Sequence, residues 1–101
     1  MERFVRGYLA TVVRDPVVAW TRLTANFQTA SGGYQRYIAW WGGLEKATVR
    51  SIEADPVDLT VEYDVRYDWV KGGGKGKLKH DRTTLELTFN AGQYLIDYEQ
   101  S

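Results

Sequence analysis

The most constraining feature of this chain is an unbroken alternation of apolar and polar residues from Val57 to Trp69. The odd-numbered residues are apolar: Val57, Leu59, Val61, Tyr63, Val65, Tyr67 and Trp69. The even-numbered residues are polar: Asp58, Thr60, Glu62, Asp64, Arg66 and Asp68. Because successive side chains of a β-strand point to opposite faces, this pattern predicts one long strand with an apolar and a polar face. A second layer must cover the apolar face.

The neighbouring segments predict partner strands for this one. A glycine-rich turn, 71–77, leads into a return strand whose apolar residues Leu85, Leu87 and Phe89 are also odd-numbered. We expect these residues to lie on the same face as the apolar residues of the long strand. The four expected strands cover residues 44–54, 57–69, 78–89 and 93–99 and form an antiparallel meander.

The first third of the chain has helical periodicity instead. We expect one helix up to Val13, a second that starts at Asp15-Pro16 and ends by Thr24, and a third from Tyr34 to Trp41. Asp15 is a favourable N-cap residue, proline is tolerated at the first helical position, and Gly42 suits a helix end. The prediction is an α+β domain in which three N-terminal helices pack on a four-stranded antiparallel sheet.

Composition limits the function classes. A chain of 101 residues is long enough for one domain. Aromatic residues make up 14% of it, so we expect a substantial hydrophobic core. The net charge of zero argues against a nucleic-acid partner, which would require a surplus of Lys and Arg. With no Cys and one His, no metal site is predicted. No cofactor is predicted, and no stretch is apolar for long enough to span a membrane.

Several short motifs add a family resemblance. Trp20 and Leu23 precede Phe27-Gln28, a Gly-Gly-Tyr motif follows at 32–34, and the aromatic pair Trp40-Trp41 stands just before the first strand. The closing segment 94–99 reads YLIDYE. These motifs resemble a subgroup of nuclear transport factor 2-like domains from actinobacteria. That subgroup is found at the C-terminal ends of membrane-bound Ser/Thr kinases and related regulators.

The resemblance implies a cone in which a curved, cystatin-like sheet wraps the helices. Residues 1–101 would be one nuclear transport factor 2-like domain, a fragment of a longer protein. It would serve as a non-catalytic ligand-binding or sensing domain, an accessory of a regulatory protein such as a kinase. Its location would then be the extracytoplasmic face of the membrane.

Six aromatic residues on the helical stripe and the odd-numbered strand face are expected to line a cavity inside the cone. They are Tyr8, Tyr37, Trp41, Tyr63, Tyr67 and Trp69. A small apolar molecule is the expected ligand of such an aromatic pocket, with the hydroxyls as polar contacts. The alternative is that these side chains simply fill the core, which is the usual role of aromatic residues at this periodicity.

An enzyme of the isomerase or polyketide-cyclase type is the alternative function. Such an enzyme needs a base inside the cavity and a hydrogen-bond donor facing it. Asp81 and His80 are the candidate bases, and Tyr8 or Tyr67 the candidate donor. Because neighbouring residues of a strand point to opposite faces, Asp81 and His80 cannot form a dyad, and the odd-numbered Asp81 is the one expected to point inward.

The polar sheet face and the hairpin edge are candidate contact surfaces. The acidic and basic residues of the long strand would lie beside Arg82, Thr84, Glu86 and Thr88 of the return strand. This face could pair two copies as a homodimer or stay solvated, and a peptide could dock on the face or the edge. The glycine-rich turn is not followed by a helix, so it does not match a phosphate-binding loop.

Overall fold

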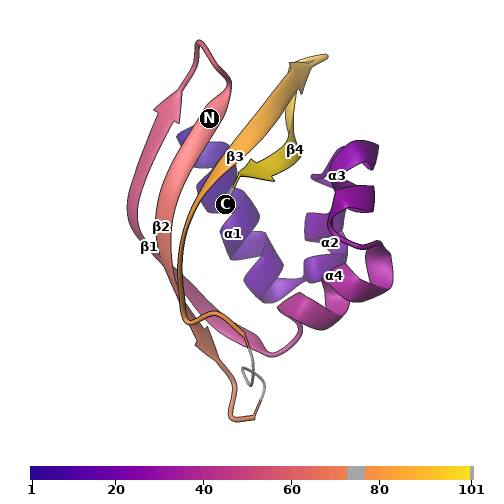
Figure 1. Cartoon of the computed structure of the whole chain (residues 1–101), viewed down its shortest axis with the longest axis vertical. Helices are drawn as coiled ribbons and strands as arrows, with labels where there is room; N and C mark the ends of the chain where they lie inside the picture. The colour runs from indigo at the N-terminus through magenta and orange to yellow at the C-terminus, as the bar shows by residue number, and fades with distance from the viewer. Residues whose placement is uncertain (73–76, 101) are drawn as a thin grey trace.

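The computed structural model describes residues 1–72 and 77–100, and these form four helices followed by four strands (Figure 1). The helices are α1 (Glu2–Arg14), α2 (Pro16–Trp20), α3 (Ala25–Ala30) and α4 (Tyr34–Trp41). The strands are β1 (Leu44–Asp55), β2 (Thr60–Trp69), β3 (His80–Asn90) and β4 (Gln93–Gln100). Part of the predicted glycine-rich turn, 73–76, lies outside the described residues.

The strands form one antiparallel sheet in the order β1-β2-β3-β4. All four helices lie on one side of it, with α1 directly against the sheet (Figure 1). The predicted α+β class and the meander are therefore confirmed. The sheet is open, neither closed nor strongly curled.

Strand β2 shows the predicted alternation, although it starts later than expected. Val61, Tyr63, Val65 and Tyr67 are all buried, whereas the polar residues between them are exposed or half-buried. The prediction that the strand begins at Val57 is wrong, because Val57 lies in a turn and is 89% exposed. The Asp55 carboxylate accepts the Val57 N–H at 3.0 Å and thus stabilises this turn.

The prediction of three helices is also wrong, since the second predicted helix ends early and α3 follows it. The Asp15 carboxylate accepts the Val17 N–H at 3.1 Å, so the predicted N-cap of α2 is confirmed. Thr24 was expected to end that helix, but its Oγ1 accepts the Phe27 N–H and caps α3. The Thr24 N–H donates to the carbonyl of Ile96 at 2.8 Å, so this connection runs along β4.

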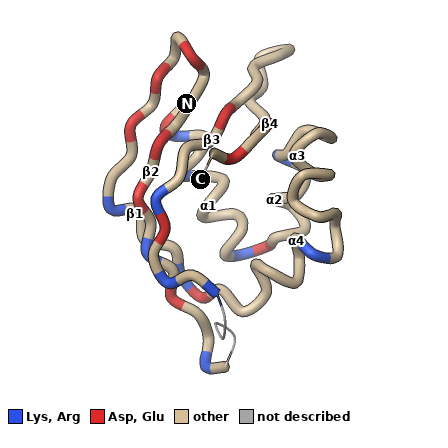
Figure 2. Tube along the Cα trace, viewed as in Figure 1, with Lys and Arg blue, Asp and Glu red and all other residues tan. Residues whose placement is uncertain are grey.

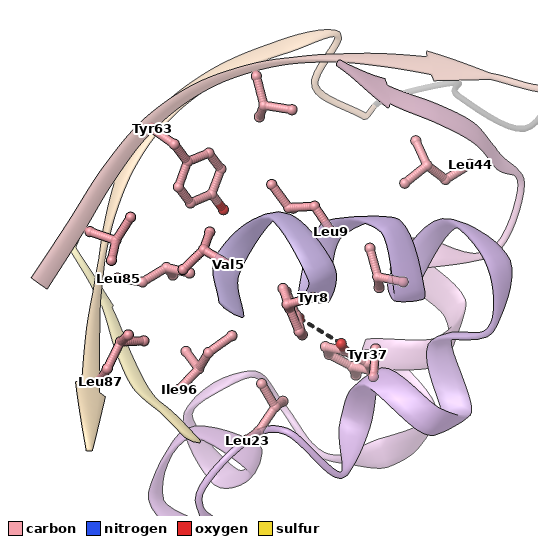
Figure 3. Close-up of a cluster of buried hydrophobic side chains, with 14 of the residues drawn as sticks. Val5, Tyr8, Leu9, Leu23, Tyr37, Leu44, Tyr63, Leu85, Leu87 and Ile96 are labelled. Carbon is pink, nitrogen blue, oxygen red and sulfur yellow. Dashed lines mark hydrogen bonds between the residues drawn. The ribbon is translucent and has the colours of Figure 1, made fainter. Parts of the chain in front are cut away.

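The centre of the core is aliphatic and lies between α1 and the sheet (Figure 3). Its fully buried side chains are Val5, Leu9, Val12, Val61, Val65 and Ile96. Leu85 and Leu87 of β3 face this cluster as predicted, but Phe89 does not: it is 53% exposed near the β3–β4 turn and packs on Tyr94. The centre of the core is therefore formed by buried aliphatic side chains, and Phe89 lies outside it.

Charged residues of both signs are distributed along β1, β2 and β3 (Figure 2). On the face of the sheet away from the helices, Arg82 of β3 donates to the Glu62 carboxylate of β2 at 2.9 Å. Arg82 lies opposite Asp64 in the ladder and Thr84 lies opposite Glu62, as the alternation predicted. The outer face is thus a polar surface with cross-strand ion pairs.

Candidate functional site

A cavity of about 470 Å³ lies between the helices and the sheet. Its lining residues are Tyr8, Phe27, Ala30, Ser31, Arg36, Tyr37, Trp40, Trp41, Tyr63, Tyr67, Leu78, Asp81, Tyr98 and Glu99. Five of the six aromatic residues predicted for the cavity are among them. The exception is Trp69, which packs outside the lining.

Trp69 packs beside the cavity, between Leu78 and Trp40. Its indole N–H donates to the carbonyl of Leu78 at 2.8 Å, and its ring lies 5.4 Å from the ring of Trp40. Lys77 lies over Trp69 with its Nζ 4.7 Å from the ring centre, and donates to the carbonyls of Ala39 and Gly42 at the end of α4. A cation at a helix C-terminus is favourable, so Lys77 and Trp69 hold α4 against the sheet. Burial lowers the pKa of Lys77.

Two of the tyrosines in the cavity share a hydrogen bond. The hydroxyls of Tyr8 on α1 and Tyr37 on α4 are 2.6 Å apart, and both side chains are buried (Figure 3). Burial raises the pKa of Tyr8 well above its usual value and that of Tyr37 to about 12, so both are neutral at pH 7. Two hydroxyls carry two protons and their mutual hydrogen bond uses one, so the second can be donated to a ligand.

Tyr63 and Tyr67 form the second pair of tyrosines. They lie four residues apart on β2, an even separation that places both on the same face of the sheet. Burial raises the pKa of both hydroxyls, and the carboxylates of Asp81 and Glu99 raise them further. These hydroxyls are therefore neutral donors that lie close to two acids.

Asp81 takes the position expected for an inward residue. It stands on β3 opposite Val65, is half-buried and lines the cavity. It makes no hydrogen bond and no ion pair with a side chain among residues 1–72 and 77–100. Its carboxylate is therefore open to a ligand from the side of the cavity.

Glu99 is a cavity residue that the sequence pattern missed. The register between β3 and β4 shifts at Asp97, which is the extra residue of a β-bulge. Ile96 faces the core before the bulge, and the extra residue then places Glu99 opposite Leu85, on the same face. The Asp97 carboxylate accepts a hydrogen bond from Thr24 at 2.7 Å, which anchors the bulge to the start of α3.

The Glu99 carboxylate reaches into the fold although the residue as a whole is exposed. The hydroxyl of buried Thr83 donates to Glu99 Oε1 at 3.2 Å. Burial of the carboxyl group raises the pKa of Glu99, the Thr83 hydrogen bond lowers it, and the negative charge of Asp81 raises it. Thr83 lies between Asp81 and Leu85 along β3, so the two acids are neighbours on the inner face.

Arg36 was also missed by the sequence pattern, and it lies at the rim of the cavity. It is exposed, and its Cδ passes over Gly32 so closely that a Cβ on Gly32 would stand 2.4 Å from it. Gly32 has a φ of 92°, a conformation that suits glycine. The Gly-Gly-Tyr motif is the only sequence signal that points to this rim.

His80 does not belong to the cavity. It is exposed on the outer face of the sheet, where its Nε2 contacts Asp64 Oδ1. That oxygen is buried and has no hydrogen-bond partner among the described residues, so the contact with His80 is its polar interaction there. His80 is therefore a wrong candidate for a base in the cavity, because the strand alternation that turns Asp81 inward turns His80 outward.

Within residues 1–72 and 77–100, no group of three or more His, Cys, Asp or Glu side chains is arranged to hold a metal ion. None of the helices in the same ranges has the length and apolar character needed to cross a membrane.

No protein-family model, no curated protein and no solved structure matches the chain. What the cavity can bind is therefore inferred from its lining residues alone. They provide aromatic walls, neutral hydroxyl donors, two carboxylates and one arginine at the rim.

Proposed function

We propose that this chain is a non-catalytic ligand-binding or sensing domain whose ligand occupies the cavity between the helices and the sheet. The observation that supports it is the cavity itself, because about 470 Å³ falls in the range of small-molecule sites. Aromatic side chains form much of its wall, and buried hydroxyls supply a few polar contacts. This combination is typical of sites that bind a small, mostly apolar molecule.

The same proposal includes the type of fold and the larger protein to which the domain would belong. Helices that cover one face of an antiparallel sheet, with a cavity between them, fit a nuclear transport factor 2-like cone. The motifs at 20–23, 27–28, 32–34 and 40–41 favour an accessory domain of a membrane-bound regulator such as a Ser/Thr kinase. The polar outer face, with its ion pair between Glu62 and Arg82, would then be the surface for pairing two copies.

A neutral fluorescent probe tests whether the cavity binds. N-phenyl-1-naphthylamine is apolar and brightens when it leaves water, so titration with it reports an apolar site. Ala30→Trp places a large side chain in the lining from α3 and should abolish the signal. Ala10→Trp is the matched control, because Ala10 is exposed on α1 and is not part of the lining. Equal binding by both variants would contradict the proposal.

A second candidate is a proton-transfer enzyme of the isomerase or cyclase type. Asp81 favours it, because this carboxylate lines the cavity together with Tyr67 and could serve as a base beside a donor. Exchange of α-hydrogens of enolisable ketones in D₂O, followed by NMR, tests this function. The enzyme hypothesis requires that the wild type catalyses this exchange and that Asp81→Asn abolishes it. Glu53→Gln, at an exposed position of β1, should leave the exchange rate unchanged.

A further inference from the structure

The described part of the cavity contains more negative than positive charge. Asp81 and Glu99 enter the lining from β3 and β4, on either side of Thr83. The one arginine of the lining, Arg36, is exposed at the rim on α4. A ligand in the cavity therefore meets two carboxylates on its sheet side.

Neither of these acids has a basic partner among the described residues. The ion pairs there are Arg6–Glu2 on α1, and Arg66–Asp68, His80–Asp64 and Arg82–Glu62 on β2 and β3. Two neighbouring carboxylates without a counter-charge disfavour each other's ionised form. A cation placed between them removes this penalty and gains charge-assisted hydrogen bonds.

An aromatic part of the cavity wall, from α4 and β2, is also suited to a cation with an apolar body. Trp40, Trp41 and Tyr67 all line it, and each pair of rings is close to perpendicular, with interplanar angles of 79° to 83°. Their centres are 4.6 to 5.9 Å apart, so they form one rigid cluster. The face of an aromatic ring attracts a cation and also packs against apolar groups.

We propose that the cavity binds a small organic cation, an amine with an apolar body. Its ammonium group lies between Asp81 and Glu99. Its apolar body lies against the aromatic rings of α4 and β2. This inference rests on the proposed function as a ligand-binding domain, and it adds the chemical class of the ligand.

Three probes that share one apolar body but differ in charge test the inference by calorimetry. They are 2-(1-naphthyl)ethylamine, 2-(1-naphthyl)ethanol and 1-naphthylacetate. We expect the amine to bind at least about tenfold more tightly than the alcohol, as a charge-assisted hydrogen bond predicts. The acetate should bind most weakly, because its charge meets the two acids.

Variants identify the groups responsible. The double variant Asp81→Asn with Glu99→Gln should lose the preference for the amine and still bind the alcohol, because the apolar wall is unchanged. Glu53→Gln is the control, since it removes one carboxylate from an exposed position on β1. It should keep the preference of the wild type.

Each other outcome has a distinct meaning. Equal affinity for amine and alcohol, or a preference for amine that survives the double variant, would overturn the inference and leave the binding function standing. Tightest binding of the acetate would overturn it in favour of an anion at Arg36. Failure of all three probes and of N-phenyl-1-naphthylamine to bind would remove the proposed function together with the inference.

Discussion

The two sides of the core differ although the same strand, β2, contributes to both. Val61 and Val65 are fully buried and belong to the core cluster together with Val5, Leu9 and Val12 of α1. Tyr63 and Tyr67 point from the same face but line a cavity that also contains acids. We call these regions the aliphatic side and the tyrosine side. The comparison shows that one alternating pattern can build both a closed core and an open site.

Helix α1 shows the same division. Leu9 is buried against the sheet on the aliphatic side, whereas the adjacent Tyr8 points to Tyr37, and the two hydroxyls share a hydrogen bond (Figure 3). Leu9 contributes to stability through close packing, whereas Tyr8 contributes a hydroxyl that can hydrogen-bond to a ligand in the cavity. Stability should therefore depend mainly on the aliphatic side, and ligand binding on the tyrosine side.

Substitutions at these adjacent positions should give the largest contrast. Leu9→Ala should lower the free energy of unfolding by about 2–5 kcal/mol, since it leaves a void in a close-packed region. Tyr8→Phe should cost about 1 kcal/mol, the usual net value of one hydrogen bond. Urea denaturation followed by tryptophan fluorescence measures both. Equal costs would break the distinction between the two sides.

Alkaline pH should destabilise the tyrosine side. Folding raises the pKa of Tyr37 from 10 to about 12, so its neutral form is the one that the fold favours. This contribution is complete below pH 10 and is lost as pH rises through 12. Because one pKa unit corresponds to about 1.4 kcal/mol, the shift of two units amounts to about 3 kcal/mol.

The test compares unfolding free energies at pH 9 and pH 12 for the wild type and for Tyr37→Phe. The variant should lose less stability over this interval, because it has no phenol to ionise at that position. A loss equal to that of the wild type would mean that Tyr37 is not held neutral by its surroundings.

A pair of glycine substitutions should have smaller effects and sharpen the comparison at the rim. Gly32→Ala should cost about 1–2 kcal/mol, because a φ of 92° is unfavourable for a residue with a Cβ. Gly7→Ala should stabilise α1 by about 0.5–1 kcal/mol, since a Cβ there meets nothing within 4 Å. Thermal unfolding gives both values. Stabilisation by Gly32→Ala would contradict the role of this backbone conformation.

Much of the fold followed from the sequence because its pattern is local. The alternation in β2 fixed which side chains face the helices, and the same parity rule turned Asp81 inward and His80 outward. The start of the strand was misplaced because Val57 fits the alternation while the Asp55 carboxylate holds it in a turn. Hydrogen bonds of this kind cannot be read from hydrophobic periodicity.

The missed parts of the site depend on long-range contacts. Glu99 reaches the inner face because of the bulge at Asp97, which is tied to Thr24 far away in the sequence. Trp69 has the right parity for the cavity, but its hydrogen bond to Leu78 and the Lys77 side chain place it beside the lining. No pattern within one strand could indicate either arrangement.

Heteronuclear NMR with 2-(1-naphthyl)ethylamine tests the central claim, that the tyrosine side is the binding site, most directly. The indole N–H signals of Trp40 and Trp41 and the amide of Asp81 should shift in proportion to occupancy. The methyl signals of Leu9 and Val12 on the aliphatic side should stay in place. Shifts confined to the outer face around Glu62 and Arg82, or no shifts at saturating probe, would contradict the account.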